Sequence, residues 1–80
     1  MKARVHVTLK PAVLDPQGSA IRKALGSLGF TGVGKVRQGK LIEIELEESE
    51  PAAAQAQVEA MCKKLLVNEV IETYRLELDS

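Results

Sequence analysis

Eighty residues with a formal net charge of zero make one domain, expected over residues 1–80, with a small core, because a chain of about this length buries only about 60% of its unfolded surface. A single cysteine excludes a disulfide framework, and one cysteine and one histidine far apart in the sequence argue against a metal site. No stretch is apolar over the roughly 18 residues that a membrane span needs, and the first residues lack the apolar core of a secretion signal, so we expect a cytoplasmic protein. The remaining support for so small a core is oligomerisation.

The first predicted elements are a strand and a helix. Residues 4–10 alternate polar and apolar side chains, the pattern of a half-buried strand, and Pro11 ends it. A helix begins at Asp15-Pro16, because aspartate is a good N-cap and proline is well tolerated at the first helical position. Gly29 is a good C-terminal residue for this helix. The apolar residues on one stripe of the helix are Ile21, Leu25 and Leu28.

A β-hairpin is predicted next. Residues 32–37 read as a weak second strand, and Gln38-Gly39 reads as a tight turn. Residues 40–48 then alternate isoleucine and leucine with glutamate, which predicts a third strand with one apolar and one acidic face.

A second helix and a last strand complete the chain. The helix begins at Glu50-Pro51 and closes near Asn68. Its apolar residues follow the i, i+3, i+4, i+7 spacing and are Val58, Met61, Cys62 and Leu65. Residues 70–78 alternate again and predict the final strand.

This order predicts an α+β fold. We expect a two-layer βαββαβ sandwich, in which a four-stranded antiparallel sheet carries both helices on one face. Right-handed crossovers give the strand order 4-1-3-2, with the first strand between the third and the last. The other face of the sheet is then polar: its residues are Arg4, His6, Thr8 and Lys10 on the first strand, Glu43, Glu45 and Glu47 on one side, and Thr73, Arg75 and Glu77 on the other.

Charge is divided between the two halves of the chain. Residues 1–40 hold eight bases and one acid, a net charge of +7, and residues 41–80 hold three bases and ten acids, a net charge of −7. Two interpretations stay open: ordinary solvated faces, or complementary surfaces that meet within the fold or between subunits. Nucleic acid is not favoured as a partner, because the acidic half repels phosphates.

The sequence holds no set of catalytic residues, so we expect no catalysis by this chain alone. No Ser/His/Asp or Cys/His arrangement has usable spacing, and the glycines between residues 29 and 39 precede a strand rather than a phosphate-binding helix. Cys62 lies on an apolar stripe, which favours a buried, inert thiol. An RNA-binding βαββαβ module needs stacking aromatics, and only Phe30 and Tyr74 are aromatic.

Several polar residues have no evident role in the predicted fold and are therefore candidates for contact with a partner protein. Glu72 is the clearest, because it shares a strand face with apolar residues, where a solvated carboxylate is unexpected. The candidate contact residues are Asp15, Gln17, Gly18, Arg37, Lys40, Asn68, Glu72 and Tyr74.

Four segments of the chain closely resemble the PurS family, in the right order and spacing. These segments are Leu9–Gly18 (LKPAVLDPQG), Leu28–Phe30 (LGF), Val36–Lys40 (VRQGK) and Met61–Tyr74 (MCKKLLVNEVIETY). The departures are Ala12, where the family commonly has glycine, and Glu69, where it commonly has proline. The second makes the loop after the second helix less rigid.

The resemblance implies a non-catalytic small subunit of phosphoribosylformylglycinamidine synthase, which carries out a glutamine-dependent step of purine synthesis. It implies two partners: a large PurL-type synthetase subunit, which uses ATP and Mg²⁺, and a PurQ-type glutaminase subunit, which releases ammonia. The small subunit is expected to join the two and to assist ammonia transfer between them. It is expected to bind no cofactor itself and to form dimers or dimers of dimers. The alternative is an ACT-type regulatory module, which shares the βαββαβ order and binds an amino acid at a dimer interface.

Overall fold

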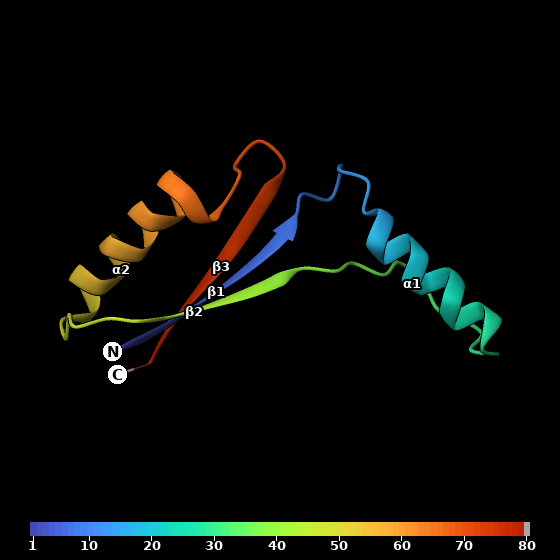
Figure 1. Ribbon diagram of the computed structural model, residues 1–80, viewed down its shortest axis with the longest axis horizontal. Coiled ribbons are helices and arrows are strands. Elements are labelled where there is room, and N and C mark those ends of the chain that lie inside the picture. Colours follow the sequence, from blue (N-terminus) through green and yellow to red (C-terminus); the bar gives the residue numbers. More distant parts are fainter. Residues whose placement is uncertain (80) are drawn as a thin grey trace.

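The computed structural model describes residues 1–79 and shows three strands and two helices. Figure 1 shows that they do not form a compact domain. The elements are β1 (Lys2–Leu9), α1 (Pro16–Ser27), β2 (Lys40–Glu45), α2 (Pro51–Met61), a π-helical turn η1 (Cys62–Leu66) and β3 (Glu72–Asp79).

The sheet has the order β2-β1-β3, and both strand pairs are antiparallel. Val5 at the centre of β1 lies opposite Ile42 on β2 and Leu76 on β3. The predictions of an antiparallel sheet and of a central first strand are therefore confirmed. The N-terminal strand is central because its alternating apolar residues can be covered by neighbours on both sides.

One face of the sheet and the helix α2 enclose the core. Burial is complete at Val5 on β1 and at Val58 and Cys62 on the helical side. The buried core residues are Ala3, Val5, Val7, Val58, Cys62 and Val67. Partly buried residues packed against them are Ile42, Ile44, Leu46, Leu66, Tyr74, Leu76 and Leu78. The core involves β1, β2, β3, α2 and η1, and no residue of α1 belongs to it.

The opposite face of the sheet is polar, as predicted, and its charges pair across strands. Arg4 lies between Glu43 and Glu77 in the register. Among residues 1–79, every ion pair except Arg75–Glu77 joins the basic half of the chain to the acidic half: Lys2–Glu43, Arg4–Glu77, Arg4–Asp79, His6–Glu77 and Lys40–Glu72. Part of the divided charge is therefore used within the fold.

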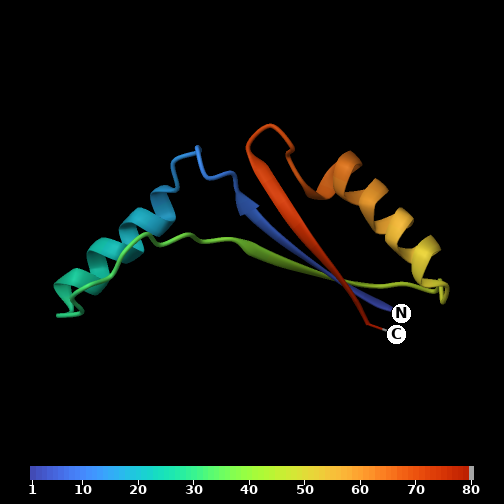
Figure 2. The same cartoon turned by 180° about the vertical axis from the view of Figure 1, so that it is seen from behind.

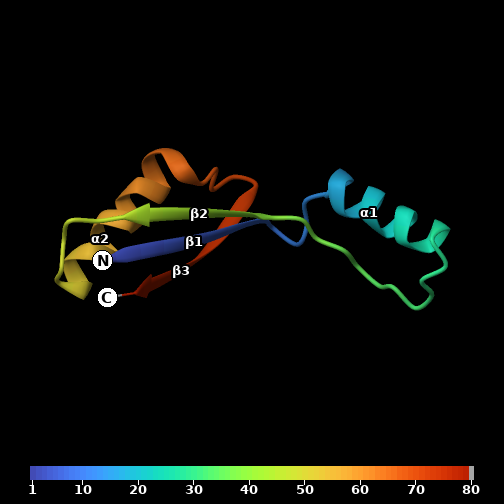
Figure 3. The same ribbon diagram turned by 60° about the horizontal axis from the view of Figure 1, so that its bottom comes forward.

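The prediction that both helices cover one face of the sheet is wrong. Helix α2 packs on the sheet, but α1 lies beyond the end of the sheet that is farther from the two termini (Figures 1 and 2). The described chain measures 48 × 26 × 14 Å, with a radius of gyration of 16.1 Å. A compact domain of this length has a radius of gyration of about 12 Å. Figure 3 shows the same separation of α1 from the sheet in a rotated view.

The prediction of a fourth strand is also wrong. Residues 32–37 lie outside any strand, and residues 31–37 form no backbone hydrogen bond within the described chain. The predicted turn at Gln38-Gly39 is absent too, because the chain runs straight through these residues into β2 (Figure 1). Gln-Gly is a weaker turn signal than Asn-Gly or Asp-Gly, so the local sequence does not force the reversal.

The second helix ends differently from its predicted pattern. Residues Cys62–Leu66 form a π-helical turn, which is wider than an α-helical turn. The wider turn rotates Leu65 away from the core, so that it is 83% exposed, and Leu66 packs against the core instead. The prediction that Leu65 lies on the buried stripe is therefore wrong. The burial predicted for Cys62 is confirmed.

Candidate functional site: the arm and its elbow

Residues 16–37, which we call the arm, form a unit that extends away from the sheet. The arm consists of α1 and the extended segment that returns from it (Figure 1). Two crossings join it to the sheet: residues 10–15, which follow β1, and residues 38–39, which precede β2. We call these two crossings, together with the arm residues Gln17, Gly18 and Arg37 that contact them, the elbow.

Asp15 ties the two crossings together. One carboxylate oxygen accepts the backbone N–H of Gly18 at 2.9 Å, which caps α1, and the other accepts the backbone N–H of Gln38 at 2.8 Å. The Gly18 hydrogen bond, with help from the Gln38 bond, holds the pKa of Asp15 below its ordinary value. Asp15 is 8% exposed, and it is the only buried charged residue in the described part of the chain. The predicted N-cap is confirmed, and its second bond was not foreseen.

Arg37 fastens the end of β1 to the arm. Its guanidinium donates to the carbonyl oxygens of Leu9 at 3.2 Å and of Lys10 at 2.7 Å, at the sheet side of the first crossing. It also donates to the carbonyl oxygen of Val13 at 3.1 Å, farther along the same crossing. A guanidinium has five donors in a rigid fork, and here it holds three carbonyl groups of an irregular segment in place.

Gly18 and Gln17 complete the elbow. A Cβ atom on Gly18 would lie 2.1 Å from the carbonyl oxygen of Val36, so only glycine allows α1 to approach the returning segment this closely. The amide of Gln38 donates to the side-chain oxygen of Gln17 at 2.7 Å. The motif from Asp15 to Gly18 is therefore a joint between α1 and the extended segment that returns from it.

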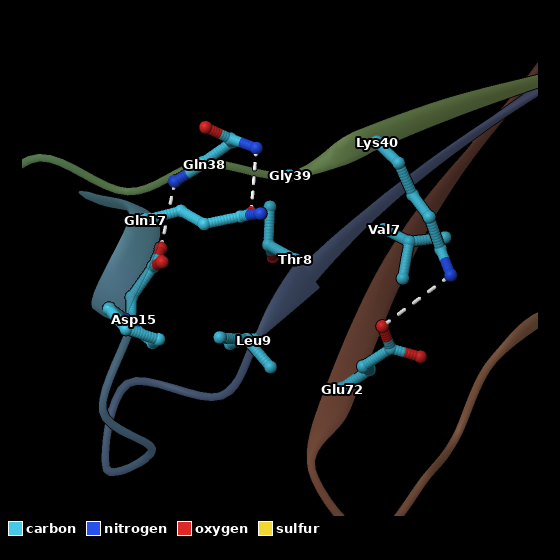
Figure 4. Close-up of a pocket in the computed structure, with 10 residues that line it drawn as sticks. Val7, Thr8, Leu9, Asp15, Gln17, Gln38, Gly39, Lys40 and Glu72 are labelled. Carbon is cyan, nitrogen blue, oxygen red and sulfur yellow. Dashed lines mark hydrogen bonds and ion pairs between the residues drawn. The ribbon is translucent and has the colours of Figure 1, made fainter. Parts of the chain in front are cut away.

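A pocket of about 370 Å³ lies between the elbow and the sheet (Figure 4). Lys40 on β2 and Glu72 on β3 stand at its sheet side, with Lys40 Nζ 3.7 Å from the Glu72 carboxylate. The other carboxylate oxygen of Glu72 accepts the backbone N–H of Asn68 at 2.8 Å. The residues that line the pocket are Val7, Thr8, Leu9, Asp15, Pro16, Gln17, Gln38, Gly39, Lys40 and Glu72.

The structure thus separates the predicted contact residues into three groups. Asp15, Gln17, Gly18 and Arg37 form the elbow. Lys40, Asn68 and Glu72 are linked to one another on the far side of the pocket. Tyr74 is the third group by itself: it packs against the core, and burial raises the pKa of its phenol. Contact of these residues with a partner stays a prediction.

The arm carries an apolar surface that nothing covers in the single chain. Ile21 is 38% exposed, Leu28 is 74% exposed and Phe30 is 59% exposed. The sequence predicted an apolar stripe of Ile21, Leu25 and Leu28 on this helix but assigned it to the wrong place, the protein's own sheet. Helical periodicity indicates that one face of a helix is buried, but it does not indicate which surface buries that face.

A second apolar surface lies on α2, at the side of the sheet bounded by β2. We call it the α2 groove; its volume is about 510 Å³, and it is lined by Ile44, Gln57, Ala60, Met61, Lys64, Leu65 and Leu66. Strand β2 has a free outer edge, since it is the last strand of the sheet on that side. An edge of this kind can accept a further strand.

No group of three metal-binding side chains occurs among residues 1–79, and no helix in that range is long and apolar enough to cross a membrane. Burial raises the pKa of the Cys62 thiol, which makes it a poor nucleophile. The notable surfaces are those that another protein chain would cover.

Comparisons with known proteins agree with this assessment. The sequence profile of the PurS family, described as phosphoribosylformylglycinamidine (FGAM) synthase, matches residues 2–80. The chain is 49% identical to the PurS subunit of phosphoribosylformylglycinamidine synthase from Synechocystis over 75 residues, which is 94% of this chain and 75% of the relative.

Solved structures show the same fold. The PurS crystal structure from Methanocaldococcus jannaschii, one of the subunits of formylglycinamide ribonucleotide amidotransferase, has a TM-score of 0.87 and 45% identity, and the match covers 95% of this chain and 92% of that one. A chain in the PurLQS structure from Thermotoga maritima has a TM-score of 0.87 and 34% identity, over 95% of this chain and 93% of that one.

The fold and its exposed apolar surfaces define a small α+β protein of the kind that packs against other chains. The chain belongs to the PurS family, whose members are subunits of phosphoribosylformylglycinamidine synthase. The resemblance predicted from four sequence segments is confirmed, and nothing in the comparisons supports the ACT-type alternative.

Proposed function

We propose that this chain is the non-catalytic small subunit of a three-part phosphoribosylformylglycinamidine synthase in purine biosynthesis. The observation that carries the proposal is the family match over residues 2–80. The PurLQS structure of the Thermotoga relative supports it, because that relative is part of an assembly with PurL and PurQ. The partners of this chain are then a PurL-type synthetase and a PurQ-type glutaminase. The proposed location of the assembly is the cytoplasm, and no helix among the described residues could cross a membrane.

The function of such a subunit is geometric. Ammonia released by the glutaminase must reach the activated amide before it is protonated or lost, so holding two active sites in register raises the useful rate. ATP and Mg²⁺ act in the large subunit, and this chain binds no cofactor. Of the predicted contact residues outside the elbow, Lys40 and Glu72 line the pocket beside the elbow, and the backbone N–H of Asn68 donates to Glu72.

Reconstitution tests the bridging function. The synthetase, the glutaminase and this chain are purified separately, and glutamine-dependent product formation is measured with and without the small chain. We expect no ligase or glutaminase activity from the chain alone and a restored glutamine-dependent rate on its addition. Ammonia-dependent activity of the synthetase serves as the control. The proposal is wrong if the two larger subunits use glutamine equally well without the chain.

We also propose that two copies associate by exchanging their arms. The described sheet has three strands and one covering helix, whereas a βαββαβ sandwich has four strands and two helices. The arm of a second copy can supply the missing strand and the missing helix. Its α1 would lie in the α2 groove, and its residues 32–36 would pair with the free edge of β2. These residues make no backbone–backbone hydrogen bonds to any part of residues 1–79, so the pairing would satisfy them.

The distribution of charge also favours a second copy of this chain as the partner. Residues 16–37 carry four bases and no acid, and residues 41–59 carry six acids and no base. None of Arg22, Lys23 and Lys35 forms an ion pair within the described chain. A second copy brings its basic arm to the acidic β2–α2 region, and a two-fold axis repeats the contact. A dimer, or a dimer of dimers, follows as the state to test by sedimentation.

A further inference from the structure

We propose that the elbow is a conformational lock that holds the arm straight and so favours the arm-exchanged dimer over a closed monomer. This inference rests on the arm exchange proposed above. In the closed monomer the chain would turn back at Gln38-Gly39. The arm would then cover the α2 groove of its own chain.

The two states share nearly all their contacts. In both, α1 lies against Leu65 and Leu66, and residues 32–36 pair with β2; only the copy that supplies the arm differs. For exchanged elements of this kind, the balance between monomer and dimer depends on the connecting segments, because the remaining interactions cancel. The elbow contains both connecting segments of this chain.

The elbow contacts are specific to the straight arm. Arg37 reaches the carbonyl oxygens of Leu9 and Lys10 at 3.2 and 2.7 Å because the returning segment passes beside the end of β1. If the chain reversed at Gln38-Gly39, the residue before the turn would lie beyond β2, two strand spacings or about 9–10 Å from β1. Closure therefore breaks these charge-assisted hydrogen bonds.

The path of Gly39 adds a second restriction. A Cβ atom at this position would lie 2.5 Å from the carbonyl oxygen of Val7, so the straight chain passes close against β1. The N–H of Gln38 is meanwhile held by Asp15 at 2.8 Å, and its side chain by Gln17 at 2.7 Å (Figure 4). The residues that a hairpin turn would need are thus held in an extended conformation.

Two variants act on the lock in different ways. Arg37→Ala removes the contacts to β1, and Arg75→Ala is its control, because Arg75 is an exposed arginine on β3, outside both the arm and the elbow. Gln38→Asn leaves the backbone bond to Asp15 in place and supplies the Asn-Gly pair that favours a two-residue turn. Its control is Gln17→Ala, which removes the Gln17–Gln38 side-chain bond without adding a turn signal.

The experiment measures the dimer dissociation constant by sedimentation and the radius of gyration of the monomer by X-ray scattering, on full-length chains. We expect Arg37→Ala and Gln38→Asn to raise the dissociation constant at least tenfold over their controls. The radius of gyration of the released monomer should approach about 12 Å, the value for a compact domain of this length. Cooperative thermal unfolding confirms that each variant is folded.

Three results would overturn the proposed lock: an unchanged dimer dissociation constant in both variants, a released monomer whose radius of gyration stays near 16.1 Å, or loss of folding in Gln38→Asn. A wild-type chain that stays monomeric and extended at every concentration would instead overturn the arm exchange. A wild-type dimer with unaffected variants would overturn the lock alone. The two proposals therefore fail in distinguishable ways.

Discussion

Lys40 on β2 and Glu72 on β3 meet across the end of β1, with 3.7 Å between the ammonium nitrogen and a carboxylate oxygen. The two outer strands of the sheet are thereby linked over the strand between them. Glu72 has a side chain only 18% exposed, and its second oxygen accepts the N–H of Asn68. This explains a carboxylate on a strand face that is otherwise apolar.

The first prediction concerns the unequal importance of these two side chains. Glu72→Ala removes both the ion pair and the hydrogen bond to Asn68 and should lower the free energy of unfolding by about 1–2 kcal/mol. Lys40→Met removes only a long, half-exposed ion pair and should cost less than about 1 kcal/mol. Urea denaturation measures both. A larger loss for Lys40→Met would contradict this view of the pocket.

The second prediction concerns the core between β1 and α2. Val58 is fully buried, so Val58→Ala removes two methyl groups from a small core and leaves a cavity. The expected loss in the free energy of unfolding is about 2 kcal/mol. Gln55→Ala, at an exposed position of the same helix outside the α2 groove, is the control and should change stability by less than about 0.5 kcal/mol. Equal effects of the two substitutions would argue against this packing.

The third prediction is a loss of stability in acid. Hydrogen bonds from His6, Arg4 and Lys2 lower the pKa values of Glu77, Asp79 and Glu43 respectively. A carboxyl group with a lowered pKa in the folded state stabilises the fold above its ordinary pKa, and this contribution disappears as the pH falls through the lowered value.

The urea midpoint should therefore be steady near neutral pH and should fall below about pH 4. Asp79→Asn removes one of the three groups and should make the fall shallower, with little change in its position. A midpoint that is independent of pH between about 2 and 6 would show that the polar face of the sheet contributes nothing.

The fourth prediction tests the surface that receives the arm. Leu65→Asp places a charge in the α2 groove and should raise the dimer dissociation constant at least tenfold, without unfolding the chain, because Leu65 is 83% exposed in the protomer. Val70→Asp is a matched control: Val70 is 81% exposed but lies outside the groove, the arm and the elbow. Sedimentation that shows equal weakening by both would place the interface elsewhere.

The fifth prediction is that salt weakens the dimer. The basic arm and the acidic β2–α2 region attract each other through exposed charges, which are screened when the Debye length falls from about 10 Å at 0.1 M to about 3 Å at 1 M salt. The dissociation constant should rise over this range, and Arg22→Glu should weaken the dimer further at low salt. A dimer that tightens with salt would indicate a purely apolar interface.

Much of the local structure could be predicted from particular residues. Alternation placed Val5 and Val7 on the buried face of β1, and Asp15-Pro16 marked the start of α1 correctly. The candidate site was predicted less well. The unusual residues of the elbow were visible in the sequence, yet the bonds from Arg37 to three carbonyl groups were not, because they join segments more than twenty residues apart.

The sequence by itself determined the family, the polar and apolar faces of the sheet, and the order of the elements apart from the predicted strand at residues 32–37, which does not form. The elements and the faces of the sheet follow from periodicity and capping, which are local properties, and the family follows from the four matching segments. Only the tertiary structure decided that the arm leaves its own sheet and that Leu65 faces outward. The physical reason is that an apolar stripe specifies burial without specifying which surface buries it, while the direction of the arm depends on a few contacts at the elbow.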